Sequence, residues 1–329
     1  MKVVFFLRKR YRGVYSIELL FEQLISAMPQ NIEAVEKQMR FPSNGFFKRL
    51  YVSLESMFFQ GDINHITGDI HFIALFLKKK STVLTIHDIG FINHQQLLAR
   101  FMLKWFWLIL PIKKCAAITV VSEATKLEVL KFFNYKISSK IHVIHNPIRP
   151  IFFPKYKVFN AEEPVILQIG TKDNKNIPRL VEALSQIKCK LDIVGHLSQE
   201  TLEKLKFYKI DYTVSANLSD MEIVKKYEQA DIISFVSTYE GFGLPIIEAN
   251  AIGRVVVTSN TSSMPEIAGN SAHLVNPFDS ASIRSGFMKV INDTLYREKL
   301  ILNGFGNVKR FEPTEIVAQY VNLYNSLIK

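Results

Sequence analysis

Short apolar segments rich in branched residues alternate with longer amphipathic segments through the whole chain. Apolar runs of about four to eight residues are typical of strands buried on both faces of a parallel sheet. Their alternation with helical segments predicts an α/β fold with doubly wound parallel sheets. We expect strands at residues 3–7, 32–35, 63–67, 83–87, 118–121 and 142–144 of the first half, and at 165–169, 190–194, 212–215, 232–236, 255–258 and 272–275 of the second.

The length of 329 residues exceeds the range, about 250 to 300 residues, in which a single hydrophobic core stops growing. Two domains are therefore expected. Three prolines, Pro150, Pro154 and Pro164, fall in a stretch without clear periodicity, which is typical of a linker. We predict a first domain over residues 1–157 and a second over 158–311, each with a Rossmann-like plan of strands and helices.

Positive charge is concentrated in the first half of the chain. Residues 1–157 contain 23 lysines and arginines against 10 aspartates and glutamates, whereas the rest contains 18 against 20. This asymmetry predicts an anionic partner, such as a phospholipid surface, a lipid diphosphate or nucleic acid. A solvated surface and charge complementation at a helix C-terminus are the alternatives. The basic clusters are the loop with Arg8, Lys9, Arg10 and Arg12, and the run Lys78 to Lys80.

The sequence contains no segment that is apolar over the roughly 20 residues needed to span a bilayer. The most hydrophobic segment, residues 101–112, contains a lysine and a proline. Its aromatic residues Phe101, Trp105, Phe106 and Trp107 fit a membrane-facing patch or a buried helix, and we favour the buried helix. The N-terminal apolar run is too short for a signal peptide, and only two cysteines occur. We therefore expect a cytoplasmic protein that attaches peripherally to the membrane.

The stretch around Glu240 is the most unusual part of the sequence. It follows an apolar run, so the loop is expected at the carboxyl end of a strand. Gly241 and Gly243 permit backbone angles that a side chain forbids, and the proline after Leu244 suits the first turn of a helix. The free N–H groups of such a helix start favour a bound phosphate. Glu248 lies about one turn into the helix, and two acids beside a phosphate site indicate a neutral, hydroxyl-rich ligand such as a sugar.

The segment from Glu240 to Glu248 resembles the Glu-x7-Glu motif of the retaining GT-B glycosyltransferases of group 1, also called family 4. The resemblance implies that Glu248 bonds the ribose of a nucleotide-sugar and that Glu240 reaches hydroxyls of its sugar. It also implies two Rossmann-like domains facing across a cleft, with a C-terminal helix in residues 312–329 crossing back to the first domain. A strand, loop and helix with two surface acids is the alternative. The other donor-binding residues of this loop are Gly241, Phe242, Gly243 and Leu244.

A second loop, after the first strand of the second half, supplies the rest of the expected donor site. Lys172 and Lys175 precede a helical segment, and lysines there oppose the helix dipole unless an anion is bound. In the family that the chain resembles, a basic pair at this place contacts the nucleotide diphosphate. The loop is one residue shorter here, so either Lys172 or Asn174 replaces the usual Arg. Lys175 is assigned to the phosphates, with Gly170, Thr171 and Lys172 beside it.

Two places in the first half complete the predicted site. His87 ends an apolar run at the carboxyl end of a strand, and in the family a histidine so placed contacts the donor sugar. Asp88 is expected to orient its imidazole, and a histidine that caps the following turn or packs in the core is the alternative. Family members often have two glycines in the first loop, near the acceptor and the diphosphate, whereas this chain has only Gly13. The nearby His71 is expected to be structural.

Two helix caps are also expected from local patterns. Asp69 precedes an apolar segment in the manner of an N-cap residue. Ser263 and Glu266 stand three residues apart with a proline between them, which matches a capping box.

Together these features predict a retaining glycosyltransferase that moves a sugar from a nucleoside-diphosphate sugar to an acceptor hydroxyl in polysaccharide or glycolipid assembly. Catalytic roles fall to His87, Lys175 and Glu240, and a helix N-terminus helps Lys175 to meet the charge of the leaving diphosphate. The sequence has no Asp-x-Asp pair, so neither a metal nor a cofactor is expected beyond the donor. The expected partners are an acceptor that is lipid-linked and an anionic membrane surface, and not nucleic acid.

Three other functions fit parts of the pattern. A GT-B sugar-nucleotide epimerase would share the donor site without needing an acceptor. A nucleic-acid-binding protein would explain the basic first half, although its cations follow no known nucleic-acid motif. A catalytically silent subunit of a glycosyltransferase is disfavoured, because both glutamates and Lys175 are present.

Overall fold

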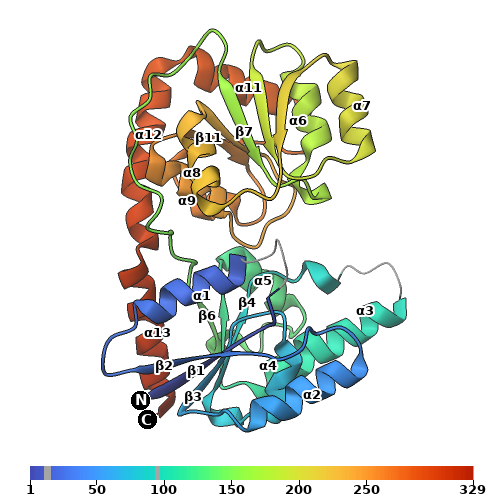
Figure 1. Cartoon of the computed structure of the whole chain (residues 1–329), viewed down its shortest axis with the longest axis vertical. Helices are drawn as coiled ribbons and strands as arrows, with labels where there is room; N and C mark the ends of the chain where they lie inside the picture. Colours follow the sequence, from blue (N-terminus) through green and yellow to red (C-terminus); the bar gives the residue numbers. More distant parts are fainter. Residues whose placement is uncertain (11–15, 93–96, 329) are drawn as a thin grey trace. The chain divides into compact units, whose positions relative to one another are not determined.

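The computed structural model describes residues 1–10, 16–92 and 97–328. The chain forms two compact units (Figure 1). The first comprises Met1–Pro147 and the C-terminal segment that begins at Pro313, and the second comprises Ile148–Glu312. Each unit contains a six-stranded sheet with helices on its faces. The predicted α/β architecture is therefore confirmed.

The first unit ends at Pro147 and not at residue 157, where the linker pattern placed the boundary. The stretch that follows packs on the second unit. Ile148 and Phe152 are buried, and the Ile148 N–H donates to the Phe311 carbonyl at 2.8 Å. Buried side chains and backbone hydrogen bonds thus attach this irregular segment to the second unit. The lack of periodicity in its sequence does not predict these contacts.

The first sheet has the strand order β2-β1-β3-β4-β5-β6, with all neighbours parallel. Chain order reverses beside β1, because β2 lies on one side of it and β3 on the other. In sheets of this kind, ligands bind outside the carboxyl ends of the strands at such a reversal. All the strands predicted for this half are present, with ends shifted by at most a few residues: β1 (Lys2–Leu7), β2 (Glu33–Gln38), β3 (Ile63–Ile66), β4 (Thr82–Ile86), β5 (Ala117–Val120) and β6 (Ile141–Val143).

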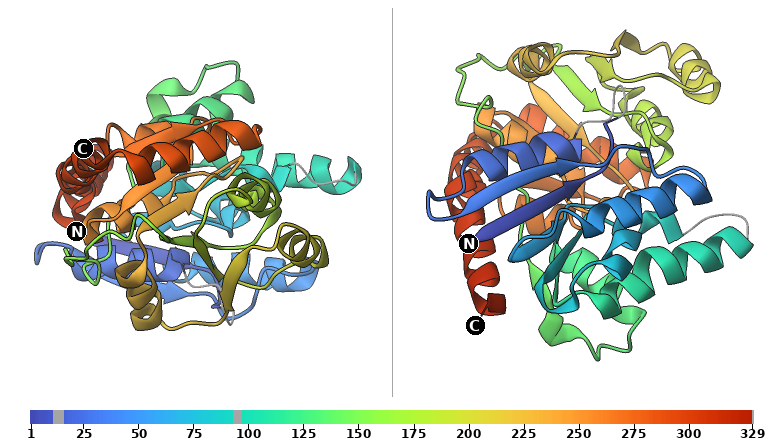
Figure 2. Two further views of the ribbon diagram at one scale, coloured as in Figure 1. Left: turned by 90° about the horizontal axis from the view of Figure 1, so that it is seen from above. Right: turned by 60° about the horizontal axis from the view of Figure 1, so that its bottom comes forward.

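Helices cover both faces of this sheet (Figures 1 and 2). On one face, α1 (Ser16–Ser26) and α13 (Pro313–Ile328) lie side by side and share a core with Phe5, Phe21 and Ile63. Among the described residues, no helix has both the length and the apolar character needed to cross a membrane. The other helical segments are α2 (Phe46–Met57), η1 (His71–Phe76), η2 (Lys79–Ser81), η3 (Gly90–Ile92), α3 (Leu97–Leu103), the π-helical η4 (Lys104–Ile109), α4 (Leu110–Lys114), α5 (Glu123–Lys131) and η5 (Ser138–Lys140).

A buried polar contact fastens α13 to the first sheet. The ring of His65 on β3 is fully buried. Its Nδ1 lies 2.6 Å from the Tyr324 hydroxyl, and its Nε2 lies 2.7 Å from Thr85 Oγ1. Burial, with a smaller contribution from His87, lowers the pKa of His65 to about 3. The imidazole therefore stays neutral in the folded protein at pH values where it is protonated in the unfolded chain.

Acid is therefore expected to destabilise the protein through His65. The unfolded chain takes up a proton near the ordinary pKa of 6.5, and the folded chain does so only near 3. Stability from this group is present above pH 6.5 and is lost as the pH falls, by up to about 1.4 kcal/mol per pH unit. The free energy of unfolding, measured in urea at pH 7, 6 and 5, should fall less steeply with decreasing pH for His65→Gln than for wild type. Equal slopes would contradict the assignment, and the exposed His196→Gln is the matched control.

The second sheet has the order β12-β11-β10-β7-β8-β9, again with all neighbours parallel. Its strands match the six predicted ones: β7 (Val165–Ile169), β8 (Lys190–Val194), β9 (Asp211–Ser215), β10 (Ile232–Phe235), β11 (Val255–Ser259) and β12 (Ala272–Val275). Its helical segments are η6 (Asp173–Lys175), α6 (Ile177–Leu184), α7 (Gln199–Phe207), α8 (Asp220–Gln229), α9 (Leu244–Ile252), α10 (Met264–Ala268), α11 (Ser280–Asn292), α12 (Thr294–Val308) and η7 (Lys309–Phe311).

The strand order of the second sheet decides which loops meet. β10 is hydrogen-bonded to β7, although 62 residues of chain separate the end of β7 from the start of β10. Because neighbouring parallel strands end at the same edge, the loop from Gly170 to Lys175 comes beside the loop from Ser237 to Gly243. These are the two loops in which the sequence predicted the donor site.

Candidate functional site

Lys175 and Glu240 form an ion pair at the carboxyl edge of the second sheet. The Lys175 ammonium lies 2.6 Å from Glu240 Oε1, and each side chain is 16% exposed. The Asn174 amide donates to the same oxygen at 3.1 Å, and the ammonium also lies over the ring of Phe235, 4.6 Å from its centroid. Partial burial makes such a pair stronger than an exposed one, because less water screens it. Two of the predicted catalytic residues are thus in direct contact.

The loop before Lys175 is shaped to guide its side chain. Gly170 has a φ of +83°, and a Cβ at this position would lie 3.0 Å from Lys175 Cε. Thr171 is half-buried and Lys172 is exposed. Of the two candidates for the missing Arg, Asn174 contacts Glu240 and its neighbour's carbonyl, whereas Lys172 points its charge to solvent.

Two serines fix the backbone of the Glu240 loop. Ser262 Oγ donates to the Glu240 carbonyl at 2.6 Å and accepts from the Glu240 N–H at 3.2 Å. Ser263 Oγ donates to the carbonyls of Glu240 and Phe242. Ser263 makes no cap hydrogen bond to α10, so the predicted capping box is wrong. Its hydroxyl is used in the tertiary contact with this loop instead.

Helix α9 begins at Leu244, where the sequence predicted a helix start, with Gly243 as its N-cap residue. Gly241 precedes it in the loop, and Phe242 is buried edge-on against Phe311, with ring centroids 5.7 Å apart. In the described chain, no side chain caps this helix start. Its first backbone N–H groups and the positive end of its dipole are therefore suited to an anion.

Glu248 lies in α9 and is only 7% exposed. The Tyr227 hydroxyl donates to Glu248 Oε2 at 2.6 Å, and the Arg149 guanidinium lies 3.6 Å from Oε1. Arg149 also donates to Asp220 at 2.7 Å. Burial raises the pKa of Glu248, and the charge of Arg149 and the Tyr227 hydrogen bond oppose that rise. A carboxylate held in this way presents its acceptor oxygens in one fixed orientation.

Three residues that position this site were not predicted. Arg149 and Tyr227 hold Glu248, and Asn176 donates to the carbonyls of Val236 at 3.0 Å and Pro277 at 2.7 Å. Asn176 has a φ of +59°, and an Asn just before a helical segment with a proline is a recognisable local signal for such a turn. No local sequence signal predicts the roles of Arg149 and Tyr227, because each is distant in sequence from Glu248, which it contacts.

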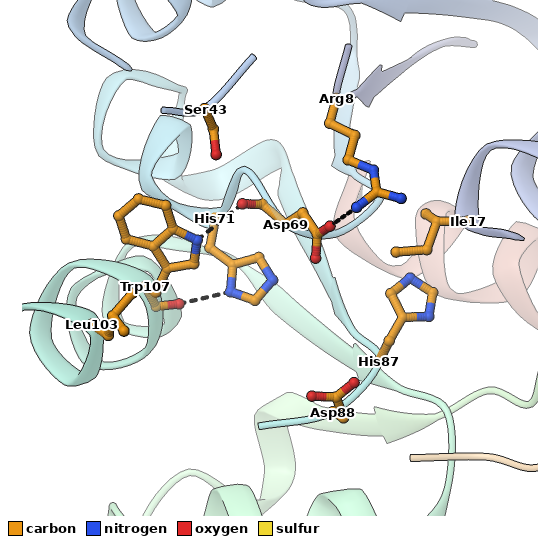
Figure 3. A pocket seen from close by; sticks show the side chains of 9 residues that line it. All are labelled: Arg8, Ile17, Ser43, Asp69, His71, His87, Asp88, Leu103 and Trp107. Carbon is orange, nitrogen blue, oxygen red and sulfur yellow. Dashed lines mark hydrogen bonds and ion pairs between the residues drawn. The ribbon is translucent and has the colours of Figure 1, made fainter. Parts of the chain in front are cut away.

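The first unit has a polar pocket of about 320 Å³ at the carboxyl ends of β1, β3 and β4 (Figure 3). Asp69 and Arg8 form an ion pair at its wall, and Arg8 also bonds Glu18 at 2.7 Å. Figure 3 shows His71 and His87 on the same pocket. The remaining lining residues are Ile17, Ser43, Asp88, Leu103 and Trp107.

His87 is held in one tautomer at the pocket wall. Its Nε2 lies 2.7 Å from the Thr67 carbonyl, so Nε2 carries the proton and Nδ1 is an acceptor. Its ring passes so close to Gly68 that a Cβ there would lie 2.9 Å from His87 Cδ2. Burial lowers the pKa of His87 against the opposing effect of the Thr67 hydrogen bond, so the imidazole is neutral near pH 7. A neutral ring can accept a hydrogen bond from a sugar hydroxyl.

The neighbours of His87 differ from the predictions. Asp88 accepts from the Gly90 N–H at 2.9 Å and does not orient the imidazole. Asp69 does not cap a helix, since the residue before η1 is Ile70 and the Asp69 carboxylate pairs with Arg8. His71 is buried, with Nδ1 2.7 Å from the Trp107 carbonyl, in agreement with a structural role.

The basic first loop is largely neutralised within its own unit. Arg8 pairs with Glu18 and Asp69, and Arg10 pairs with Glu22. Gly13 and Arg12, which the sequence placed near the donor and the acceptor, lie outside the described residues. Over residues 1–10, 16–92 and 97–328, no group of three or more His, Cys, Asp or Glu side chains could hold a metal ion.

Both halves of the chain match models of glycosyltransferase families. Residues 31–151 match the model described as Glycosyltransferase Family 4, and residues 152–306 match Glycosyl transferases group 1. The chain is 26% identical over 276 residues to O-antigen chain mannosyltransferase B of Escherichia coli, which covers 74% of this chain and 70% of that protein. It is 27% identical over 228 residues to O-antigen chain mannosyltransferase RfbU of Salmonella typhimurium, covering 64% and 61%. A match to mannosyltransferase WbdA of Escherichia coli covers 31% of that longer protein.

Solved structures show the same fold at low sequence identity. Anabaena HepE in complex with UDP and glucose gives a TM-score of 0.81 at 15% identity, covering 99% of this chain and all of that one. A glycosyltransferase from Rickettsia africae gives 0.75 at 18% identity, covering 100% and 98%. Two models of glycosyltransferase families thus match residues 31–306 between them, and the fold is that of the GT-B glycosyltransferases.

Proposed function

We propose that the chain transfers a hexose from a nucleoside-diphosphate sugar to an acceptor hydroxyl in polysaccharide or glycolipid assembly, with retention of the anomeric configuration. The observation that carries this proposal is the ion pair of Lys175 and Glu240 beside the start of α9, with Glu248 one turn into that helix. Mannose is the first candidate for the sugar, because O-antigen chain mannosyltransferases are among the relatives.

Each polar group of the site has a role in this proposal. Lys175 and the first N–H groups of α9 stabilise the negative charge that builds on the departing diphosphate. Glu240 accepts hydrogen bonds from the sugar hydroxyls, and Glu248 accepts them from the ribose. His87 accepts a hydrogen bond from the donor sugar through Nδ1. The leaving-group charge is met by these cationic and backbone groups without a metal ion.

The acceptor is proposed to be lipid-linked and the protein to work on the cytoplasmic face of an anionic membrane. The charge of the first unit supports this part of the proposal. Residues 1–147 and 313–329 contain 21 lysines and arginines against 11 acids, whereas residues 148–312 contain 20 against 19. Cations near an anionic surface each contribute about 1 kcal/mol of attraction.

Product analysis tests the proposal. The protein is incubated with UDP- and GDP-linked hexoses and a lipid-linked or short saccharide acceptor in excess EDTA, and the product linkage is determined by NMR. We expect transfer from a mannose donor, undiminished by EDTA, with the anomeric configuration of the donor retained. An inverted linkage would contradict the mechanism, and an absolute need for magnesium or manganese would contradict the role given to Lys175.

The same experiment separates the rival function. A sugar-nucleotide epimerase would change the donor sugar in the absence of any acceptor, which the NMR spectrum of the donor alone would reveal. The family matches do not favour this alternative or a nucleic-acid-binding function.

A further inference from the structure

Helix α2 exposes most of its large apolar side chains, whereas the residues that it buries are Val52 and two serines. Ser53 and Ser56 are 3% and 0% exposed, whereas Phe46 and Phe47 are 72% and 83% exposed. The serine hydroxyls are satisfied inside the helix, since Ser53 donates to the Arg49 carbonyl and Ser56 to that of Ser53. A helix at a water-facing surface normally has the opposite arrangement. The outer face of α2 is therefore suited to an apolar medium.

A second apolar element lies beside α2. In α3 and η4, Phe101, Met102 and Phe106 are 59%, 48% and 44% exposed, so the buried helix favoured from the sequence is wrong for Phe101 and Phe106. The reason is that η4 packs inward through Leu108 and Ile109, which leaves Phe101 and Phe106 outside. Trp107 is half-buried and packs against the core of the first unit. Between the two elements runs a groove of about 520 Å³. We call the outer faces of α2, α3 and η4, with this groove, the α2–α3 surface.

The grouping of large apolar side chains on the α2–α3 surface is typical of an interaction site. Single exposed apolar residues are common on soluble proteins, whereas contiguous groups of large ones indicate binding to another apolar surface. Here exposed apolar residues come from α2 and its C-cap and from α3 and η4, and four of them line one groove. They include Phe46, Phe47, Leu50, Leu54, Met57, Phe58, Leu98, Phe101, Met102 and Phe106.

Most charged side chains on the elements of this surface are basic. Residues 97–109, which form α3 and η4, contain Arg100 and Lys104 and no acid. On α2, Lys48 is exposed, and Arg49 lines the groove. The single acid of α2, Glu55, is paired with Lys37 at 2.8 Å. An apolar face bordered by cations is complementary to anionic headgroups above acyl chains.

We propose that the α2–α3 surface inserts into the headgroup and upper acyl region of an anionic lipid bilayer. Phenylalanines enter the apolar layer while Lys48 and Arg100 remain among the phosphates. This inference rests on the proposed function in that the bilayer would present the lipid-linked acceptor. It assigns the attachment to α2 and α3, and not to the first loop, where Arg8 and Arg10 are already in ion pairs.

Vesicle sedimentation with the full chain tests the inference. Wild type should sediment with vesicles of phosphatidylcholine and phosphatidylglycerol, and high salt should release only part of it, because the apolar contacts are not screened. Phe47→Ser and Phe106→Ser should each reduce the partition coefficient about tenfold, since burying a phenylalanine contributes at least that factor. Lys48→Glu with Arg100→Glu should abolish the preference for phosphatidylglycerol. The exposed Phe207→Ser, on α7 of the second unit, is the matched control and should sediment as wild type does.

Two results would overturn the inference. One is that the double variant Phe47→Ser, Phe106→Ser sediments with vesicles as wild type does. The other is that wild type is a dimer by light scattering and this variant a monomer, because a second copy would then cover the surface. Calorimetry with UDP and GDP, without vesicles, reports on the donor site separately. If the double variant loses vesicle binding and keeps its affinity for the nucleotide, the inference is supported. If wild type does not bind either nucleotide, the proposed sugar transfer is contradicted, and the inference about the α2–α3 surface is unaffected.

Discussion

Replacing Lys175 with methionine should lower kcat about 100- to 1000-fold, the loss of roughly 2.7 to 4 kcal/mol found when one donor to a developing negative charge is removed. Methionine keeps the length of the side chain that passes over Gly170, so the change removes mainly the charge. Lys172→Met is the matched control, because Lys172 lies in the same loop but is exposed. Its kcat should stay within a few-fold of wild type.

The ion pair with Glu240 gives this experiment a second part. Lys175→Met leaves the Glu240 carboxylate without its partner at 2.6 Å, so part of the loss could come from a displaced Glu240. Glu240→Gln and the double variant separate the two effects. If Lys175 acts on the leaving diphosphate, the double variant should be slower than either single one. Full activity in Lys175→Met, or an equal loss in Lys172→Met, would contradict the assignment.

Replacing Glu248 with glutamine should weaken the binding of the nucleoside diphosphate about 10- to 150-fold, since hydrogen bonds to a charged group contribute about 1.5 to 3 kcal/mol. Glutamine preserves the volume and an acceptor for the Tyr227 hydroxyl, which lies at 2.6 Å from the carboxylate. The fold should therefore survive. Calorimetry with UDP and GDP measures the change, and Glu240→Gln is the control that should leave this affinity unchanged while lowering kcat.

Glu248→Ala is expected to have a further effect on stability. It removes the partner of two buried or half-buried groups, the Tyr227 hydroxyl and the Arg149 guanidinium. An unsatisfied buried polar group costs about 1 to 3 kcal/mol, so the midpoint of urea unfolding should fall for alanine more than for glutamine. If both Glu248 variants bind the nucleotide as tightly as wild type does, the ribose role is wrong.

The sequence by itself determined the strands, the two-sheet architecture and the loop from Glu240 to Glu248. These features depend on local information. A branched apolar run forms a buried strand wherever it stands, and glycine followed by a proline specifies a loop and a helix start within a few residues. The helix predicted near Leu244 begins at that residue for this reason.

The tertiary structure alone decided which side chains meet. Lys175 and Glu240 are 65 residues apart, and they touch because β7 and β10 are neighbours in the sheet. Tyr227 reaches Glu248 from another helix, and Ser263 bonds a distant loop in place of its own helix. The same holds for the outward face of α2. Whether an apolar helix face is covered depends on what else packs there, and the periodicity of one segment carries no information about its neighbours.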